Sequence, residues 1–282
     1  MTTDAIPARP SPQRTVVAFR GFAVELGDTQ HGNGVHIGPI DLEIGEGECV
    51  CVVGPSGAGK TTIGQALLGM LAPGGRHTGG SVEVDGVSLF DVDQATLRSV
   101  RGRRVSMIFQ DPGAALNPVR RLDRIFADVL SAHGTTSRVE IEQRSRAALT
   151  AAQLNPDAVL RSYPHELSGG MCQRAMVALA LVNQPAVVVA DEPTTALDPT
   201  TQKEVLELFA TVRRTTTLVV ITHDLRVARR LADRVVVLSR GQIVDSGPVQ
   251  QIMTRPNHPV TQALVANQKL TRLNPRTSGA KE

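Results

Sequence analysis

The hydrophobic and polar positions divide the chain into short apolar runs separated by longer amphipathic segments. Apolar and polar residues alternate over 16–26, as in an edge strand, and 40–44 is a second short strand. Residues 81–87 indicate a further strand, and 240–247 a hairpin at the edge of a sheet. Continuous apolar runs, typical of strands buried on both faces, occupy 49–53, 105–109, 187–190, 218–221 and 235–238.

Segments with helical periodicity lie between most of these strands. The predicted helices cover 60–71, 122–133, 138–154, 170–182, 202–213 and 225–232. Strands that alternate with helices indicate a mostly parallel sheet with helices on its faces. The pattern stays helical from about 111 to 184, which interrupts this alternation. The sequence therefore predicts an α/β fold with a mostly parallel core sheet, an antiparallel β edge subdomain and an inserted helical subdomain.

Composition and charge narrow the possible functions. The 282 residues are 41% apolar and 20% charged, ordinary values for a protein with a sizeable core. A net charge of +3 and an aromatic share of 2% argue against nucleic-acid binding through a basic surface or stacked bases. No segment reaches the ~18 consecutive apolar residues of a membrane span. Because the N-terminal residues also lack a hydrophobic signal region, we expect a cytosolic chain that acts at a membrane only through a partner.

The three cysteines are interpreted as buried, reduced thiols. Cys49 and Cys51 are two residues apart on a predicted strand, and we expect them to point to opposite faces of it. That expectation argues against a metal held by both. Cys172 lies in a predicted helix.

Polar segments are expected at both ends of a single folded domain. Residues 1–14 are rich in proline and predict a flexible tail, residues 15–265 the folded domain, and residues 266–282 a polar C-terminal tail. A basic run precedes the strand at 105–109, and its position is compatible with a solvated loop or with contact to anionic lipid head groups. Its members are Arg98, Arg101, Arg103 and Arg104.

The loop over residues 54–61 reads G-P-S-G-A-G-K-T and matches the phosphate-binding pattern G-x-x-x-x-G-K-[ST] in full. A buried strand precedes it and a helix follows, which is the context that such a loop requires. The glycines let backbone N–H groups face a β-phosphate, Lys60 would reach the β and γ oxygens, and Thr61 would offer its hydroxyl to Mg²⁺. The predicted nucleotide-binding residues are Gly54, Pro55, Ser56, Gly57, Ala58, Gly59, Lys60, Thr61 and Thr62.

Polar side chains also follow three of the buried strands. Asp191 ends the strand at 187–190 and can hold Mg²⁺ together with Thr61. Glu192 comes next and can polarise a water for attack on a γ-phosphate, although a helix-capping role is the alternative. Gln110 can contact Mg²⁺ or the attacking water, and His223 can hydrogen-bond a γ-phosphate. Taken alone, a polar strand end or a structural histidine explains the last two equally well.

A second anion-binding feature lies at residues 167–174, which read L-S-G-G-M-C-Q-R. Ser168, Gly169 and Gly170 place a hydroxyl and open backbone N–H groups at the start of a helix, an arrangement that binds anions. The chain therefore carries two surfaces suited to phosphate.

The order of these motifs resembles that of the ATP-binding-cassette (ABC) ATPases. G-P-S-G-A-G-K-T, I-F-Q-D-P, L-S-G-G-M, V-V-V-A-D-E-P, T-A-L-D and I-T-H-D follow one another in that order, and the resemblance covers about residues 15–265. It implies a RecA-like P-loop core that binds and hydrolyses ATP with Mg²⁺. In such a protein Gln110 would be the Q-loop residue, Glu192 the general base and His223 the switch histidine, with Thr61, Gln110 and Asp191 serving the metal.

The same resemblance implies a site shared between two subunits. Ser168, Gly169 and Gly170 would contact the γ-phosphate of an ATP held by the partner's P-loop. Asp198, in T-A-L-D, would lie at the dimer interface and link the two sites.

Three segments are similar to those of the dipeptide, oligopeptide and nickel importer ATPases. They are Q-D-P-x-x-x-L-N-P, Y-P-H-E-L-S-G-G-M and H-P-V-T-Q-A-L, the last with Val260 where the subgroup usually has Tyr. This implies uptake of a peptide, nickel or a metal chelate. The implied partners are a second ATPase subunit, identical or paralogous, two transmembrane permease subunits and, indirectly, an extracytoplasmic substrate-binding protein. The chain would lie at the cytoplasmic face of the membrane as a peripheral protein.

Two departures from the family pattern affect these expectations. Leu26 stands where such ATPases usually have an aromatic that stacks on adenine, and His36 or the glycine-rich loop at 28–38 is the candidate replacement. No cysteine follows Cys172, so no iron–sulfur cluster is expected. The alternatives to an importer are an exporter ATPase, or a DNA-repair or translation-associated ATPase. The short span from Gln110 to Ser168 and the single cassette argue against the last two.

Overall fold

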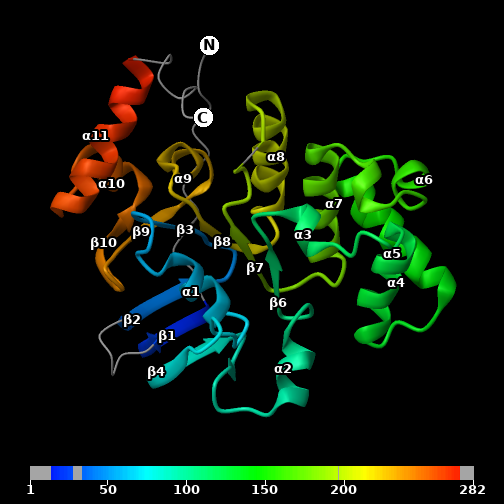
Figure 1. The fold of residues 1–282 in the computed structure, drawn as a ribbon, viewed down its shortest axis with the longest axis horizontal. Helices are drawn as coiled ribbons and strands as arrows, with labels where there is room; N and C mark the ends of the chain where they lie inside the picture. Colours follow the sequence, from blue (N-terminus) through cyan, green and yellow to red (C-terminus); the bar gives the residue numbers. More distant parts are fainter. Residues whose placement is uncertain (1–13, 28–33, 196, 274–282) are drawn as a thin grey trace.

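Six strands form the central sheet of the computed structural model, which describes residues 14–27, 34–195 and 197–273. They are β3 (Cys49–Val53), β6 (Val105–Ile108), β7 (Val187–Asp191), β8 (Thr217–Ile221), β9 (Arg234–Ser239) and β10 (Gln242–Pro248). Their order is β10-β9-β3-β8-β7-β6, and only the β10–β9 pairing is antiparallel (Figure 1). The predicted parallel core with a hairpin at its edge is confirmed.

A second sheet is antiparallel and has the order β2-β1-β4-β5. Its strands are β1 (Thr15–Leu26), β2 (Val35–Gly45), β4 (Arg76–Val84) and β5 (Val87–Ser88). β2 begins earlier than predicted because its first residue, Val35, already pairs with Leu26 of β1. The predicted strand over 81–87 is divided by a turn, where Asp85 and Gly86 both have positive φ.

The helices cover both faces of the central sheet. They are α1 (Lys60–Ala66), α2 (Gln94–Val100), α3 (Pro112–Ala115), α4 (Leu122–Ala132), α5 (Arg138–Ala151), α6 (Pro156–Val159), α7 (Gly169–Leu181), α8 (Pro199–Val212), α9 (Leu225–Leu231), α10 (Val249–Thr254) and α11 (Pro259–Leu273), with a 3₁₀ turn at Pro164–Glu166. The green helices α3 to α7 lie together beyond the β6 edge, as the inserted helical subdomain (Figure 1). α1 is shorter than predicted because Leu68 N–H donates to Gln65 O and Gly69 follows with a φ of 61°.

Alternate residues of β3 face two separate hydrophobic cores. Val50 and Val52 pack with α1 and the antiparallel sheet, whereas Cys49, Cys51 and Val53 pack with the helices on the opposite face. The expectation that Cys49 and Cys51 point to opposite faces was therefore wrong, because side chains two apart on a strand lie on the same side. Among the described residues, no group of three His, Cys, Asp or Glu side chains is placed to hold a metal.

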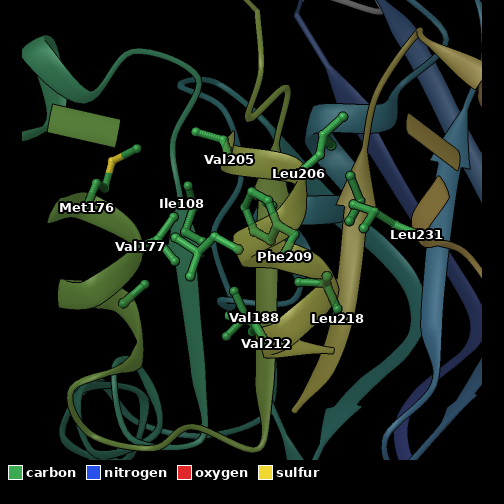
Figure 2. Close-up of a cluster of buried hydrophobic side chains, with 14 of the residues drawn as sticks. Ile108, Met176, Val177, Val188, Val205, Leu206, Phe209, Val212, Leu218 and Leu231 are labelled. Atoms are coloured by element: carbon green, nitrogen blue, oxygen red, sulfur yellow. The ribbon is translucent and has the colours of Figure 1, made fainter. Parts of the chain in front are cut away.

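Helix α8 supplies much of the core on the helical face. Figure 2 shows Phe209 and Val212 of α8 over the sheet strands that carry Val188 and Leu218. All four side chains are buried, and Phe209 is fully so. Burial of such side chains stabilises the fold by roughly 1.5–3 kcal/mol each. This packing fixes the strands whose ends carry the polar residues considered below.

The sequence predicted a polar tail at each end of the chain, and the structure describes the two ends to different extents. The N-terminal tail expected at 1–14 lies outside the described residues except for Arg14, which pairs with Asp85 at 2.6 Å. At the other end, α11 runs to Leu273 and so crosses position 266, where the sequence suggested a polar tail. Val260, Leu264 and Val265 of this helix pack against the core.

The basic run before β6 is only partly solvated. Arg101 donates from Nε to Leu68 O at 2.7 Å and from a terminal nitrogen to Gly69 O at 3.0 Å. Arg104 donates to both the backbone and the carboxylate of Asp85. These two arginines therefore close backbone turns of the core, and neither is free for a lipid head group.

Candidate functional site

The glycine-rich loop between β3 and α1 lies against two other strands. A Cβ atom at Gly54 would be 2.1 Å from the carbonyl oxygen of Leu238, and one at Gly59 would be 2.9 Å from Ile37 Cδ1. Gly59 also has a φ of 99°, which residues with a side chain rarely adopt. Both positions require glycine, so β9 and β2 determine the path of the loop.

The turn between β9 and β10 supports the same loop from outside. Gly241 N–H donates to Ala58 O at 3.1 Å, and its carbonyl accepts from Gly38 N–H at 2.8 Å. Between the anchored ends of the loop, three residues are exposed: Pro55, Ser56 and Gly57. The loop is thus rigid at its base and open to solvent at its tip, where an anionic ligand can approach the backbone N–H groups.

Lys60 lies across this loop. Its Nζ donates to the carbonyl oxygens of Gly54 and Pro55, each at 3.0 Å. Burial lowers the pKa of the Lys60 ammonium, and the negative charges of Glu192 and Asp191 partly oppose that shift. The ammonium therefore lies near both carboxylates.

The two threonines after Lys60 differ in exposure. The side chain of Thr61 is exposed at the start of α1, whereas that of Thr62 is buried within the helix. Thr61 is therefore the one whose hydroxyl can face a ligand.

Asp191 is a buried carboxylate at the end of β7. It is 7% exposed, and among the described residues its Oδ1 has no hydrogen-bond partner. Burial raises the pKa of Asp191, while a hydrogen bond from Thr61 and the charge of Lys60 act in the opposite direction. A buried oxygen without a partner is costly, so this atom is suited to a cation that the described residues do not supply.

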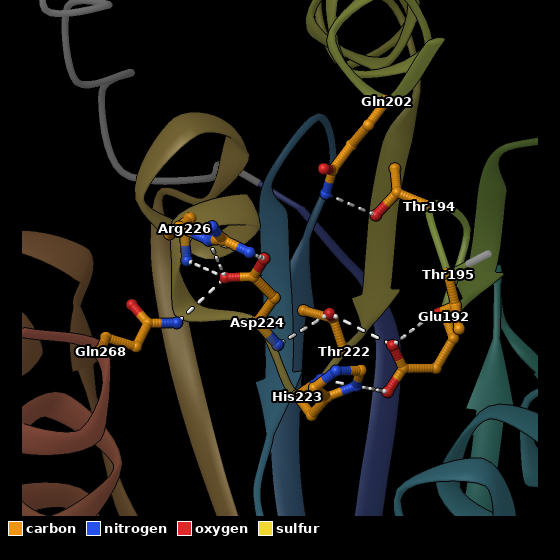
Figure 3. Close-up of polar contacts among 9 residues, drawn as sticks. All are labelled: Glu192, Thr194, Thr195, Gln202, Thr222, His223, Asp224, Arg226 and Gln268. Atoms are coloured by element: carbon orange, nitrogen blue, oxygen red, sulfur yellow. Dashed lines mark hydrogen bonds and ion pairs between the residues drawn. The ribbon is translucent and has the colours of Figure 1, made fainter. Parts of the chain in front are cut away.

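Glu192 is held by three residues from two segments, Thr195 after β7 and Thr222 and His223 after β8 (Figure 3). Its Oε1 accepts from the backbone N–H of His223 at 3.0 Å and lies 2.7 Å from His223 Nδ1. Its Oε2 accepts from the hydroxyls of Thr195 at 3.1 Å and Thr222 at 3.4 Å. Glu192 also has a φ of 45°, a conformation rare for residues other than glycine. The backbone turn and four contacts fix this carboxylate beside Asp191.

The structure therefore brings Lys60, Asp191, Glu192 and His223 to one edge of the sheet. Thr195 and Thr222 were missed from the sequence, because a threonine next to a motif has no distinctive spacing. The only available signal was that each lies within three residues of Glu192 or next to His223.

Gln110 lies at the same edge of the sheet, two residues beyond β6. Ile108 pairs in parallel with Ala190, so the ends of β6 and β7 are level. The Gln110 side chain is exposed. This is the position from which a role near Asp191 was predicted.

The position expected for an adenine-stacking aromatic is aliphatic. Leu26 is half-buried at the end of β1, and its partner on β2, Val35, is 49% exposed. His36 is exposed, and its backbone lies against Gly241. Residues 28–33, in the loop between β1 and β2, lie outside the described residues. That His36 or this loop replaces the aromatic stays a prediction.

The second phosphate-facing surface lies away from the first (Figure 1). Ser168 caps the N-terminus of α7, where its hydroxyl accepts from Met171 N–H at 3.3 Å. Ser168 and Gly169 are exposed, and a Cβ at Gly170 would meet Thr201 Cγ2 of α8 at 2.3 Å. The fold does not bring these three residues to the chain's own glycine-rich loop.

Asp198 caps α8, the helix that packs against α7. Its carboxylate accepts from the backbone N–H groups of Thr200 at 3.0 Å and Thr201 at 3.1 Å. The side-chain hydroxyl of Thr201, followed by these backbone hydrogen bonds, lowers the pKa of Asp198. Within the single chain, its contacts are those of a helix cap on an exposed surface.

The chain has a glycine loop between a strand and a helix, a lysine across that loop, and carboxylates after a neighbouring parallel strand. This combination defines a P-loop nucleotide-binding protein. Residues 37–195 match the family model described as ABC transporter. The chain belongs to the ABC transporter family and carries its ATP-binding ATPase domain. No helix in the described part of the chain combines the length and apolar character that crossing a membrane requires.

Several curated proteins are similar to the chain over most of its length. A peptidoglycan transport ATP-binding protein, YejF, of Agrobacterium fabrum is 39% identical over 82% of this chain, which spans 43% of that protein. A probable peptide ABC transporter ATP-binding protein, y4tR, of Sinorhizobium fredii is 40% identical over 81% of this chain and 70% of its own length. The oligopeptide transport ATP-binding protein OppD of Lactococcus lactis is 37% identical over 80% of this chain and 68% of its own.

Solved structures share the fold. The ATP-binding cassette MJ0796, described as a dimer in a post-hydrolysis state with ADP and Pi, matches with a TM-score of 0.73 and 28% identity. The match covers 83% of this chain and 98% of that one. CbiO1 of Clostridium perfringens matches with a TM-score of 0.72 at 22% identity, which supports the fold alone.

Proposed function

We propose that this chain hydrolyses ATP as the motor subunit of an ABC importer. The observation that carries the proposal is the geometry of Glu192, whose carboxylate is fixed by His223 and two threonines next to the buried Asp191. The exposed tip of the glycine-rich loop and Lys60 bind the triphosphate. The phosphates would compete for the Lys60 ammonium with the carbonyl oxygens of Gly54 and Pro55, to which Nζ donates.

The residues present fit a magnesium ion. Asp191 Oδ1 is buried without a hydrogen-bond partner among the described residues, and the exposed Thr61 lies beside it. A carboxylate and a hydroxyl are oxygen ligands of the type that Mg²⁺ takes, and Gln110 can add an amide oxygen from the neighbouring strand. When bound, the ion would neutralise charge on the β and γ oxygens.

Glu192 acts as the general base on the attacking water. Its carboxylate is only 15% exposed, which limits competing hydration. His223 keeps Glu192 oriented and leaves its other ring nitrogen for a γ-phosphate oxygen or the water. Loss of the γ-phosphate would thus remove a hydrogen-bond partner of His223. Because His223 also contacts Glu192, the change would affect the Glu192 carboxylate directly.

The separation of the two phosphate-facing surfaces supports a site completed by a second ATPase subunit, identical or paralogous. Ser168, Gly169 and Gly170 would contact the γ-phosphate on the partner's P-loop, and Asp198 would lie at the interface. The dimeric form described for MJ0796 supports this arrangement. A single chain would then be a slow ATPase.

The cargo we propose is a peptide. OppD and y4tR are named as oligopeptide and peptide transport proteins, and several other relatives bear such names. A nickel or metal-chelate cargo has no comparable support. The chain would bind two permease subunits at the cytoplasmic face of the membrane and be served by an extracytoplasmic binding protein. An exporter or a non-transport ATPase remains the alternative class.

The test is Glu192→Gln in the full chain, alone and with the membrane subunits that co-purify with it. Loss of the general base should lower phosphate release by about 10²–10⁴-fold. Binding of labelled ATP should persist, because Glu192 does not touch the glycine-rich loop. Glu142→Gln, a change at an exposed helix position, is the matched control and should leave turnover unchanged. Normal turnover in Glu192→Gln would remove Glu192 from the chemistry.

A further inference from the structure

The C-terminal helix α11 reaches the loop that carries His223. Gln268 of α11 donates from Nε2 to Asp224 Oδ1 at 3.0 Å, across 44 positions of sequence. Figure 3 shows this contact at the end of a chain of polar contacts that leads to Glu192. Gln268 and Asp224 are both partly shielded from solvent, so water competes only in part for the bond.

The Asp224 carboxylate is also fixed by hydrogen bonds from Arg226 of α9, the helix that it caps. It is the N-cap of α9 and accepts from the backbone N–H of Arg226 at 2.7 Å. The Arg226 guanidinium also donates to both oxygens, which raises the pKa of Arg226. These hydrogen bonds fix the carboxylate in place, and a donor on α11 can act on the loop through it.

The loop that Asp224 belongs to also holds the candidate general base. Asp224 N–H donates to Thr222 Oγ1 at 3.0 Å, and the same hydroxyl donates to Glu192 Oε2 at 3.4 Å. The intervening His223 contacts Glu192 through both its backbone N–H and its ring. Thr222 and His223 therefore hold Glu192, and the next residue, Asp224, is held by α11.

We propose that Gln268 is a positioning residue, through which the C-terminal helix sets the geometry of the 222–224 loop on Glu192. The inference rests on the proposed ATPase function. Within the part of the chain that the structure describes, the Gln268 side chain hydrogen-bonds to Asp224 and not to the loop at 54–61 or to Glu192, so we expect it to act on the rate of the chemical step and not on ATP binding. α11 is anchored independently, because Thr261 is fully buried and Val265 is 8% exposed against the core. Changing Gln268 therefore disconnects the helix from the loop without releasing the helix.

The test uses Gln268→Glu in the full chain, in the same preparation that hydrolyses ATP. The substitution keeps the shape of the side chain but places a carboxylate against Asp224. Since a hydrogen bond to a charged group is replaced by repulsion, we expect kcat to fall by about fivefold or more with KM for ATP unchanged. Gln262→Glu is the matched control, because Gln262 lies on the same helix and its amide donates to Pro256 O, outside the 222–224 loop.

A second variant reverses the donor and the acceptor. In Gln268→Glu with Asp224→Asn, the new amide at 224 can donate to the new carboxylate at 268. We expect the double variant to be faster than the product of the two single effects, because the bond between α11 and the loop re-forms.

Three results decide the matter. Unchanged kcat in Gln268→Glu, in a preparation whose wild type is active, overturns the inference. So does a double variant whose loss is the product of the single losses, since the two side chains would then act independently. An inactive wild type with bound ATP would instead refute the proposed function, which keeps the two failures distinct.

Discussion

The ion pair between Arg213 and Asp233 joins three elements beneath the site, and its loss should be costly. Arg213 follows α8 and is 4% exposed, and its guanidinium donates to Asp233 Oδ1. The other oxygen, Oδ2, accepts from the backbone N–H of Cys49, at the start of the strand that leads into the glycine-rich loop, at 2.9 Å. The pair therefore ties α8 and the segment before β9 to β3.

Arg213→Met keeps the apolar stem and removes the charge, which leaves the Asp233 carboxylate without its cation. Breaking a buried pair in this way costs about 3–5 kcal/mol, and the 22% exposure of Asp233 places the expected loss near the lower figure. With a urea m-value of about 3 kcal/mol/M, a loss of about 3 kcal/mol lowers the unfolding midpoint by about 1 M. The assay is urea unfolding of the full chain, followed by circular dichroism.

Two controls separate the buried charge from the lost packing. Arg146→Met removes an exposed partner of Asp157, 2.5 Å away, and should lower the unfolding midpoint far less than Arg213→Met does, because solvent screens an exposed pair. Adding Asp233→Asn to Arg213→Met removes the uncompensated charge while an amide oxygen can still accept from Cys49, so part of the stability should return. Equal losses in the single and double variants would refute the argument from charge, as would a midpoint for Arg213→Met within about 0.3 M of the wild type.

Two further predictions concern the carboxylate and the second surface of the site. Burial raises the pKa of Asp191 in the folded chain, so ionisation of this carboxyl costs the folded state stability as pH rises from about 4, the unfolded value, through the raised pKa. Asp191→Asn should therefore stabilise the nucleotide-free chain at pH 7 in urea unfolding, with no gain below pH about 4, and should weaken magnesium-dependent ATP retention. A destabilised variant at pH 7 would contradict this. Ser168→Arg should leave binding of labelled ATP to the single chain intact but abolish turnover; loss of binding would place Ser168 in a site within one chain.

The sequence predicted the parts of the site whose spacing follows from local geometry. A phosphate-binding loop must lie between a buried strand and a helix, so residues 54–61 could be recognised without knowledge of the rest of the fold. Asp191, Glu192 and His223 each follow an apolar strand, and parallel strands end at one edge. The strand pattern therefore places them at one edge of the sheet, and in the structure Glu192 and His223 are in contact there while Lys60 lies near Asp191 and Glu192.

Local pattern failed where contacts between distant segments decide the outcome. The early start of β2 follows from pairing of Val35 with Leu26, which no helix or strand propensity of that glycine-rich segment indicates. Likewise Arg101 and Arg104 looked like a solvated basic run, but the fold turns them onto the backbone of other elements.

By itself, the sequence determined the fold class and the family and indicated the candidate site residues, because the motifs report local backbone geometry and charge. Only the tertiary structure decided which groups support them. Gly241 on Ala58, Thr222 on Glu192 and Gln268 on Asp224 join segments far apart in the chain. Hydrogen bonds of this kind depend on where packing brings each segment, and a single side chain in sequence carries no sign of its distant partner.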